Sequence, residues 1–160
     1  MSAPAECKNC DIVEDDDYSC DSAYDNVINF PTIYQEQLLR STVLSEELRV
    51  IYYECKEDNW DAQNAAAIPY KAIEEALYFI DSLPEEIPLP DEITPSSDGS
   101  IDLEWYENPR CIFNALIYGD DKIVYAGMFG EIEKHNGILP LEKESYQSLL
   151  PHIKRVKHAR

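Results

Sequence analysis

The sequence predicts an α+β fold: helices packed on one face of an antiparallel meander of three or four strands, preceded by an acidic N-terminal tail. Apolar residues recur at helical spacing between residues 34 and 80, and they alternate with polar residues over residues 101–106. A further helical pattern follows near the C-terminus, and helices grouped apart from strands are typical of α+β proteins. A chain of 160 residues fits one domain, which we place at residues 31–160.

The predicted tail, residues 1–30, is acidic and has almost no aliphatic periodicity. It contains a single lysine, Lys8, and it cannot bury enough apolar surface to offset the entropy of ordering it. We therefore expect this segment to be disordered. Its carboxylates are Glu6, Asp11, Glu14, Asp15, Asp16, Asp17, Asp21 and Asp25.

Two short helices are predicted over residues 34–55, divided near Ser41 and Thr42. Ser45 precedes two glutamates and fits an N-cap of the second helix, because acidic residues are favourable in a first helical turn. The apolar positions that support these helices are Tyr34, Leu38, Leu44, Leu48, Ile51 and Cys55.

A third helix is predicted after a loop at residues 56–68. Pro69 suits the first helical position, and Leu83 and Pro84 end the helix. Its apolar stripe consists of Tyr70, Ile73, Ala76, Leu77 and Ile80, and its polar face consists of Lys71, Glu74, Glu75 and Asp81.

The predicted strands follow a proline-rich segment, residues 84–95, which fits an edge strand because proline is tolerated there. Residues 96–99 form a turn, and residues 101–106 alternate between apolar and polar side chains, as a half-buried strand does. Residues 111–118 and 122–129 are apolar at both phases. We therefore place these two strands at the centre of the sheet and expect them to be more fully covered.

Beyond residue 130, the sequence predicts that residues 131–135 prolong the last strand and that Asn136 and Gly137 turn the chain. A C-terminal helix follows. Pro151 lies inside this helix and predicts a kink or a division into two short helices. The apolar residues of the helix are Tyr146, Leu149, Leu150, Ile153 and Val156.

The charge balance restricts the classes of partner. The formal net charge is −19, from 32 acidic and 13 basic residues. Contacts to phosphate need lysine or arginine, so this balance argues against direct binding to nucleic acid or to an anionic membrane and favours a basic protein partner. No apolar run is long enough to cross a bilayer and no secretion signal is evident, so we expect a cytoplasmic protein.

One long stretch, from Ala72 through Pro109, contains no lysine or arginine. If the helix after Pro69 packs beside the strand at residues 101–106, their polar faces would form a broad negative field. Repulsion within such a field favours a site for a basic partner, although a solvated acidic face explains the same residues. The carboxylates of this candidate partner-binding face are Glu74, Glu75, Asp81, Glu85, Glu86, Asp91, Glu92, Asp98, Asp102, Glu104 and Glu107.

Three N-terminal cysteines are candidates for a metal or redox site. Cys7 and Cys10 form a Cys-x-x-Cys pair, and Cys20 follows. A structural zinc site commonly needs four ligands, and no second pair or nearby histidine is present. Acidic neighbours also disfavour the thiolate that redox chemistry needs. Cys55 and Cys111 fall on apolar faces and are predicted core residues.

Histidines offer a second candidate site. Glu131, Glu133 and His135 fall at alternating strand positions, where they can share one face and hold a metal or supply the carboxylates of a hydrolase. A strand edge with mixed charges gives the same pattern. His152 belongs to the basic C-terminal helix and is expected to face water. Because the sequence has neither Gly-x-Ser-x-Gly nor a phosphate-binding glycine loop, we expect a protein that is not an enzyme.

Trp60 and Asp61 form a candidate binding patch, although the simpler interpretation is that the indole covers the core and Asp61 caps a turn. The Trp-Asp pair, the helix that ends Leu83-Pro84, and the strands with Ser100–Trp105 and Tyr125–Gly127 together resemble a functionally unassigned family of small prokaryotic and phage proteins. The pattern covers residues 57–130. The family has glycine after Trp-Asp, where this sequence has Ala62. The resemblance implies a prokaryotic or phage origin and no particular mechanism.

Taken together, these features favour an acidic, non-catalytic protein that inhibits a basic, nucleic-acid-handling protein. Antitoxin-like proteins and phage anti-defence proteins that mimic nucleic acid (anti-CRISPR or anti-restriction proteins) fit this description. We expect no cofactor, and a cytoplasmic setting in a prokaryotic cell or a phage-infected host. The alternative is a small metal-binding or redox module that uses Cys7, Cys10 and Cys20.

Overall fold

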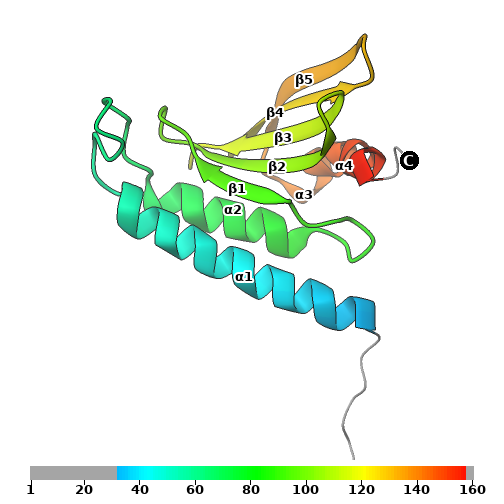
Figure 1. Ribbon diagram of the computed structural model, residues 1–160, viewed down its shortest axis with the longest axis horizontal. Coiled ribbons are helices and arrows are strands. Elements are labelled where there is room, and N and C mark those ends of the chain that lie inside the picture. The colour runs from blue at the N-terminus through cyan, green and yellow to red at the C-terminus, as the bar shows by residue number, and fades with distance from the viewer. Residues whose placement is uncertain (1–31, 158–160) are drawn as a thin grey trace, which may run out of the picture.

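The chain forms two helices, a five-stranded antiparallel sheet and a short helical C-terminus (Figure 1). The computed structural model describes residues 32–157, with side chains from residue 39 onward, so the expected tail at residues 1–30 lies outside it. The elements are α1 (Thr32–Cys55), α2 (Tyr70–Ser82), β1 (Glu92–Pro95), β2 (Ile101–Asn108), β3 (Cys111–Ile117), β4 (Lys122–Phe129), β5 (Glu133–Pro140), α3 (Lys143–Tyr146), the 3-10 helix η1 (Gln147–Leu149) and α4 (Leu150–Lys157). The predicted α+β class is confirmed.

The first helix, α1, is continuous, so the predicted break near Ser41 and Thr42 is wrong. Ser45 is not an N-cap, because its hydroxyl donates a hydrogen bond of 2.9 Å to the Ser41 carbonyl one turn earlier in the same helix. This bond satisfies the hydroxyl inside the helix, where serine otherwise competes with the backbone. The predicted apolar positions that are buried in α1 are Leu44, Leu48, Ile51 and Cys55.

The second helix, α2, begins one residue later than predicted, because Pro69 is its N-cap. It ends at the predicted place, with Leu83 as the C-cap. Tyr70 was predicted in the apolar stripe but is 56% exposed, whereas Phe79, outside that stripe, is completely buried. The helix is therefore rotated relative to the predicted stripe.

The sheet is a simple meander in the order β1-β2-β3-β4-β5, with every neighbouring pair antiparallel. It has five strands rather than the three or four predicted. The difference arises after β4, where the chain turns at Gly130 (φ +82°) rather than at Asn136 and Gly137. Gly137 is instead inside β5, where a Cβ atom would lie 2.8 Å from the Tyr125 hydroxyl. Glycine is thus needed there for close packing and not for a turn.

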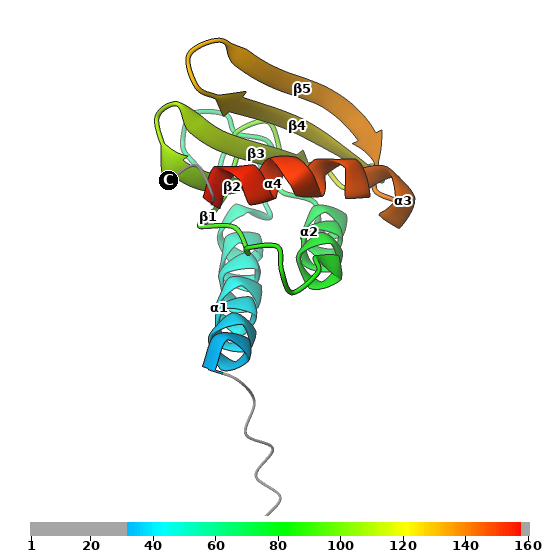
Figure 2. The same ribbon diagram turned by 90° about the vertical axis from the view of Figure 1, so that its right-hand side faces the viewer.

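All of the helices lie on one face of the sheet, here called the inner face (Figures 1 and 2). Strand alternation sends every second side chain to this face, and the cross-strand row Ile101, Ile117 and Ile123 is completely buried there. No element among residues 32–157 covers the opposite face, here called the open face.

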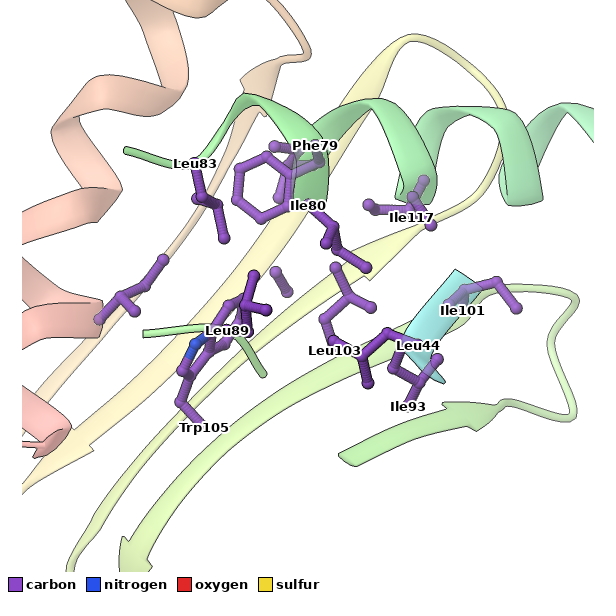
Figure 3. Packing of buried hydrophobic residues seen from close by; sticks show 14 of the residues in the cluster. Leu44, Phe79, Ile80, Leu83, Leu89, Ile93, Ile101, Leu103, Trp105 and Ile117 are labelled. Atoms are coloured by element: carbon purple, nitrogen blue, oxygen red, sulfur yellow. The ribbon is translucent and has the colours of Figure 1, made fainter. Parts of the chain in front are cut away.

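The core lies between the inner face and the elements that cover it, which are α1, α2, the proline-rich segment and the C-terminal helices (Figure 3). The Phe79 ring meets Trp105 edge to face, with centroids 6.5 Å apart. Trp105 Nε1 donates a hydrogen bond of 2.8 Å to the Pro88 carbonyl, so the only polar atom of the buried indole is satisfied. Burying a side chain such as Phe79 or Leu103 stabilises the fold by about 1.5–3 kcal/mol.

The C-terminal segment is divided into α3, η1 and α4, in line with the prediction that Pro151 interrupts a single helix. Pro151 is the second residue of α4, where its missing N–H has no intrahelical partner to lose. Ile153 and Val156 bury the inner side of α4 against β2 and β3.

Candidate protein-binding face

The predicted acidic stretch does not form one field, because its carboxylates lie on two sides of the protein. α2 packs on the inner face of the sheet, whereas the polar residues of β2 point outward from the open face. The expectation that helix and strand present their polar sides together is therefore wrong. The helix side exposes Glu74, Asp81, Glu85 and Glu86, and the open face carries Glu92, Asp102 and Glu104.

Glu75 was predicted on the acidic face but is only 6% exposed. Its Oε1 accepts a hydrogen bond of 2.9 Å from the Asp121 backbone N–H and lies 3.4 Å from Lys71 Nζ. Asp121 has φ +61°, in the left-handed region, within the turn from β3 to β4. Glu75 therefore holds this turn against α2 and is not available to a partner.

Asp91 and Asp98 are tied to local structure by ion pairing and hydrogen bonding, and Glu107 is partly buried. The Asp91 carboxylate forms an ion pair of 2.7 Å with Lys157 at the end of α4. Asp98 accepts hydrogen bonds from the backbone N–H (3.1 Å) and hydroxyl (2.7 Å) of Ser100, which fix the predicted turn before β2. Glu107 is half-buried near the end of β2. Asp91 and Asp98 are therefore less available to a partner than an exposed, unpaired carboxylate would be.

Glu92, Asp102 and Glu104, here called the open-face carboxylates, lie together on β1 and β2. Glu92 is directly opposite Glu104 in the register of these strands. Asn114 on β3 donates hydrogen bonds from Nδ2 to Asp102 (3.0 Å) and to Glu104 (3.3 Å). Among residues 39–157, no lysine, arginine or histidine forms an ion pair with any of the three.

Burial and the charges of neighbouring glutamates raise the pKa of two carboxyl groups, Asp102 and Glu47. Burial raises the pKa of Asp102, the hydrogen bond from Asn114 offsets part of this effect, and the charges of Glu104 and Glu92 raise the pKa further. On α1, burial and the charge of Glu92 raise the pKa of Glu47. The charge of Glu92 therefore acts on carboxyl groups of both β2 and α1.

Apolar side chains lie on either side of the middle row of the open face, which is Asn114, Ala126 and Asn136. The four outward-facing side chains of β3 and β4 that flank the Asn114–Ala126 pair are aliphatic or thioether, and they are half-buried. The expectation of fuller coverage for these strands is wrong on this face, because nothing in residues 32–157 packs against it. These side chains, here called the apolar strip, are Ile112, Leu116, Val124 and Met128.

An open depression of about 360 Å³ lies beside the open-face carboxylates, over β3, β4 and β5. Ala126 is at its middle, because the cross-strand register places it between Asn114 and Asn136. Met128 and Lys134 border one side. The small alanine side chain between larger neighbours creates the depression.

Trp60 and Asp61 have the structural roles of the simpler interpretation. Trp60 packs partly against the core, and its Nε1 donates a hydrogen bond of 2.9 Å to the Ala66 carbonyl. Asp61 Oδ1 accepts hydrogen bonds from the backbone N–H groups of Gln63 (2.7 Å) and Ala65 (3.0 Å). Both side chains are thus occupied within their own loop.

The predicted group of Glu131, Glu133 and His135 does not assemble. Glu131 lies in the turn before β5 and forms an ion pair of 2.6 Å with Arg110. Glu133 and His135 do share the inner face, where Glu133 Oε1 lies 2.9 Å from His135 Nε2. Arg155 binds Glu133 through two contacts of 2.5 and 2.6 Å, and Arg155 and His135 together lower the Glu133 pKa to about 2. This carboxylate is therefore part of an ion-pair network.

His152 was expected to face water, but it packs on the inner face. Its ring lies 4.7 Å from that of His135, and 6.2 and 5.7 Å from those of Phe113 and Phe129. Burial lowers the pKa of His152, and the neighbouring His135 and Arg155 lower it further. Sequence reasoning missed this cluster because its members come from β3, β4, β5 and α4.

The N-terminal candidates Cys7, Cys10 and Cys20 lie outside the described residues. Cys55 and Cys111 are buried free thiols, as predicted for core residues. Within residues 39–157, no group of three or more histidine, cysteine or acidic side chains is arranged to hold a metal ion.

Comparisons of the chain with protein-family models, with curated proteins and with solved structures found no match. Among the described helices, none combines the length and the apolar character needed to span a membrane.

Proposed function

We propose that this protein is a non-catalytic inhibitor that binds a basic, nucleic-acid-handling protein. The observation that supports the proposal is the group of open-face carboxylates, which has no cationic partner among residues 39–157. Antitoxin-like proteins and phage anti-defence proteins that mimic nucleic acid are the classes that this surface fits.

The physical reason is the repulsion among these carboxylates. Near a protein surface, two unit charges about 4 Å apart interact by about 4 kcal/mol at an effective dielectric constant of 20. A lysine or arginine from a partner, placed between Glu92, Asp102 and Glu104, would replace repulsion with attraction. Proteins that contact phosphate groups carry such cations on their binding surfaces. Carboxylates held on a rigid sheet are therefore suited to compete with nucleic acid for the same cations.

The remaining exposed carboxylates act at longer range in this proposal. Glu74 and Asp81 are exposed on α2, and Glu85 and Glu86 are exposed in the loop that follows this helix. Together with the net charge of −19, they raise the rate at which a basic partner approaches. They contribute to encounter, whereas the open-face carboxylates supply the contacts.

The resemblance of residues 57–130 to small prokaryotic and phage proteins supports the setting that we propose for this interaction. A basic enzyme or nucleic-acid-binding toxin in the cytoplasm of a prokaryotic cell, or of a phage-infected host, is the kind of target that an acidic inhibitor of this size would meet.

Affinity capture with stepwise salt elution tests the proposal. The full chain is immobilised, exposed to lysate of the host cell at about 50 mM salt, and eluted up to about 500 mM, where screening shortens the range of charge interactions severalfold. We expect a basic protein to be retained, to leave the column as salt increases, and to lose its nucleic-acid activity when bound. Retention of an acidic or neutral partner, or binding that is unchanged across the salt range, would contradict the electrostatic mechanism.

A further inference from the structure

The open face combines two properties that a solvated sheet face does not need. Antiparallel sheets with one face in water usually alternate between apolar inner residues and polar outer residues. β3 and β4 depart from this rule, because the apolar strip occupies the outward positions Ile112, Leu116, Val124 and Met128. Ile138, at the neighbouring position of β5, is 63% exposed and extends the apolar surface.

The apolar surface is hollowed at Ala126 by the open depression. The register places Ala126 between the two ends of the strip, with Val124 two residues before it and Met128 two residues after it on the same strand. The volume of the depression, about 360 Å³, is enough to accept a large aliphatic side chain from outside.

The two flanks of the strip differ in charge. On the β2 side, Asp102 and Glu104 lie directly beside Leu116 and Asn114 in the register. On the β5 side, the flanking residues are neutral or basic, with Lys134 opposite Met128. A ligand that covers the strip therefore meets carboxylates along one side only.

We propose that the open face seats an amphipathic helix of the basic partner, lying along β3 and β4 with aliphatic side chains over the apolar strip and with lysines or arginines toward β2. This inference rests on the proposed function, because it names the part of the basic partner that binds. β3 has seven residues, or about 23 Å at 3.3 Å per residue, which is the length of about 15 helical residues at 1.5 Å each.

Charge complementarity selects this occupant over a second copy of the chain. A second copy would bring another group of open-face carboxylates against the first, on a protein of net charge −19. An extended strand is also excluded from this position, because strand addition requires a free sheet edge, whereas β3 and β4 have neighbours on both sides.

Two synthetic peptides of 15 residues serve as probes. The first is a lysine–leucine helix with leucine at helical spacing along one side, and the second replaces every leucine with glutamine and keeps the same lysines. Binding to the isotope-labelled full chain is followed by amide chemical shifts. We expect the leucine peptide to become helical and to perturb residues around Ala126 on β3 and β4, with an affinity about tenfold or more above that of the glutamine peptide.

The variant Ala126→Trp fills the depression, and Ala66→Trp, at an exposed loop position, is its matched control. We expect Ala126→Trp to weaken binding of the leucine peptide about tenfold and Ala66→Trp to leave it unchanged. Equal affinity of the two peptides, or no effect of Ala126→Trp, would overturn the helix-binding inference and leave the electrostatic proposal standing if binding still declines with salt. Shifts on β3 and β4 that depend on protein concentration without peptide would also overturn it, because they would assign the face to a second copy.

Discussion

Glu92 on β1 lies directly opposite Glu104 on β2, so two carboxylates occupy one cross-strand pair on the open face of the sheet. Like charges in this position are destabilising, because their Cβ atoms are only about 5 Å apart in such pairs. Asp102 lies two residues from Glu104 on the same side of the same strand and adds a third charge. Stability of the isolated protein is thus reduced at the place where we propose that a basic partner binds.

The first prediction concerns this pair. Glu92→Gln should raise the free energy of unfolding by about 0.5 kcal/mol at low salt, because it removes one of two opposed charges. The gain should shrink as salt screens the repulsion. Urea unfolding at low and high salt measures both effects, with Glu85→Gln, an exposed loop position, as the control. A loss of stability in Glu92→Gln at low salt would show that the pair is not repulsive.

The second prediction separates two adjacent glutamates of α2. Glu75→Ala should lower the free energy of unfolding by about 2 kcal/mol, because it leaves the Asp121 N–H without its charged acceptor. Glu74→Ala, on the exposed side of the same helix, should change it by less than about 0.5 kcal/mol. Denaturant unfolding of the two variants gives the comparison. Equal effects would mean that Glu75 does not hold the β3–β4 turn.

The third prediction concerns pH. Burial, His135 and Arg155 place the pKa of folded His152 below its ordinary value of 6.5, so the unfolded chain binds this proton more readily. The stability that neutral His152 contributes to the fold is therefore fully present above about pH 6.5. This contribution is lost as the pH falls from there through the folded-state pKa. His152→Phe keeps the ring contact with Phe113 and should lose less stability than the wild type between about pH 7 and pH 5. Thermal unfolding across this range measures the difference, and identical pH profiles would contradict the assignment.

The fourth prediction concerns the Trp-Asp loop. Ala62 has φ +59°, in the left-handed region that disfavours residues with a Cβ atom. Ala62→Gly should therefore raise the free energy of unfolding by about 0.5–1 kcal/mol, whereas Ala66→Gly, which has no positive φ, should lower it. Thermal unfolding of both variants is the measurement. Destabilisation by Ala62→Gly would mean that the loop does not require this conformation.

Local patterns in the sequence were sufficient for most of the elements. The alternation from Ile101 to Tyr106, the proline at residue 69 and the glycine at residue 99 each depend on residues close in the chain, and each produced a correct element or turn. The predicted turn at Asn136 and Gly137 failed because the glycine there serves a tertiary contact with Tyr125. The same residue pair is compatible with both roles, and only the packing distinguishes them.

The candidate site was less accessible to sequence reasoning. The apolar character of residues 111–118 and 122–129 at both phases predicts coverage of both faces, whereas residues 32–157 leave one face open. Likewise, Glu75 is indistinguishable from Glu74 in a helical pattern, because burial is decided by the β3–β4 turn packed against it. The packing of the layers decides which carboxylates share a side of the protein. The spacing of residues along the chain does not reveal this packing.

The central claim is that the open-face carboxylates, rather than the total charge, bind the basic partner. Two triple variants test it with equal changes of net charge on opposite sides of the molecule: Glu92→Gln with Asp102→Asn and Glu104→Gln, and Glu74→Gln with Asp81→Asn and Glu85→Gln. The measurement is the dissociation constant of the captured basic protein for each variant. We predict that the open-face variant weakens binding at least about tenfold while the helix-side variant stays within about threefold of the wild type. Equal weakening by both variants, or greater weakening by the helix-side variant, would contradict the claim.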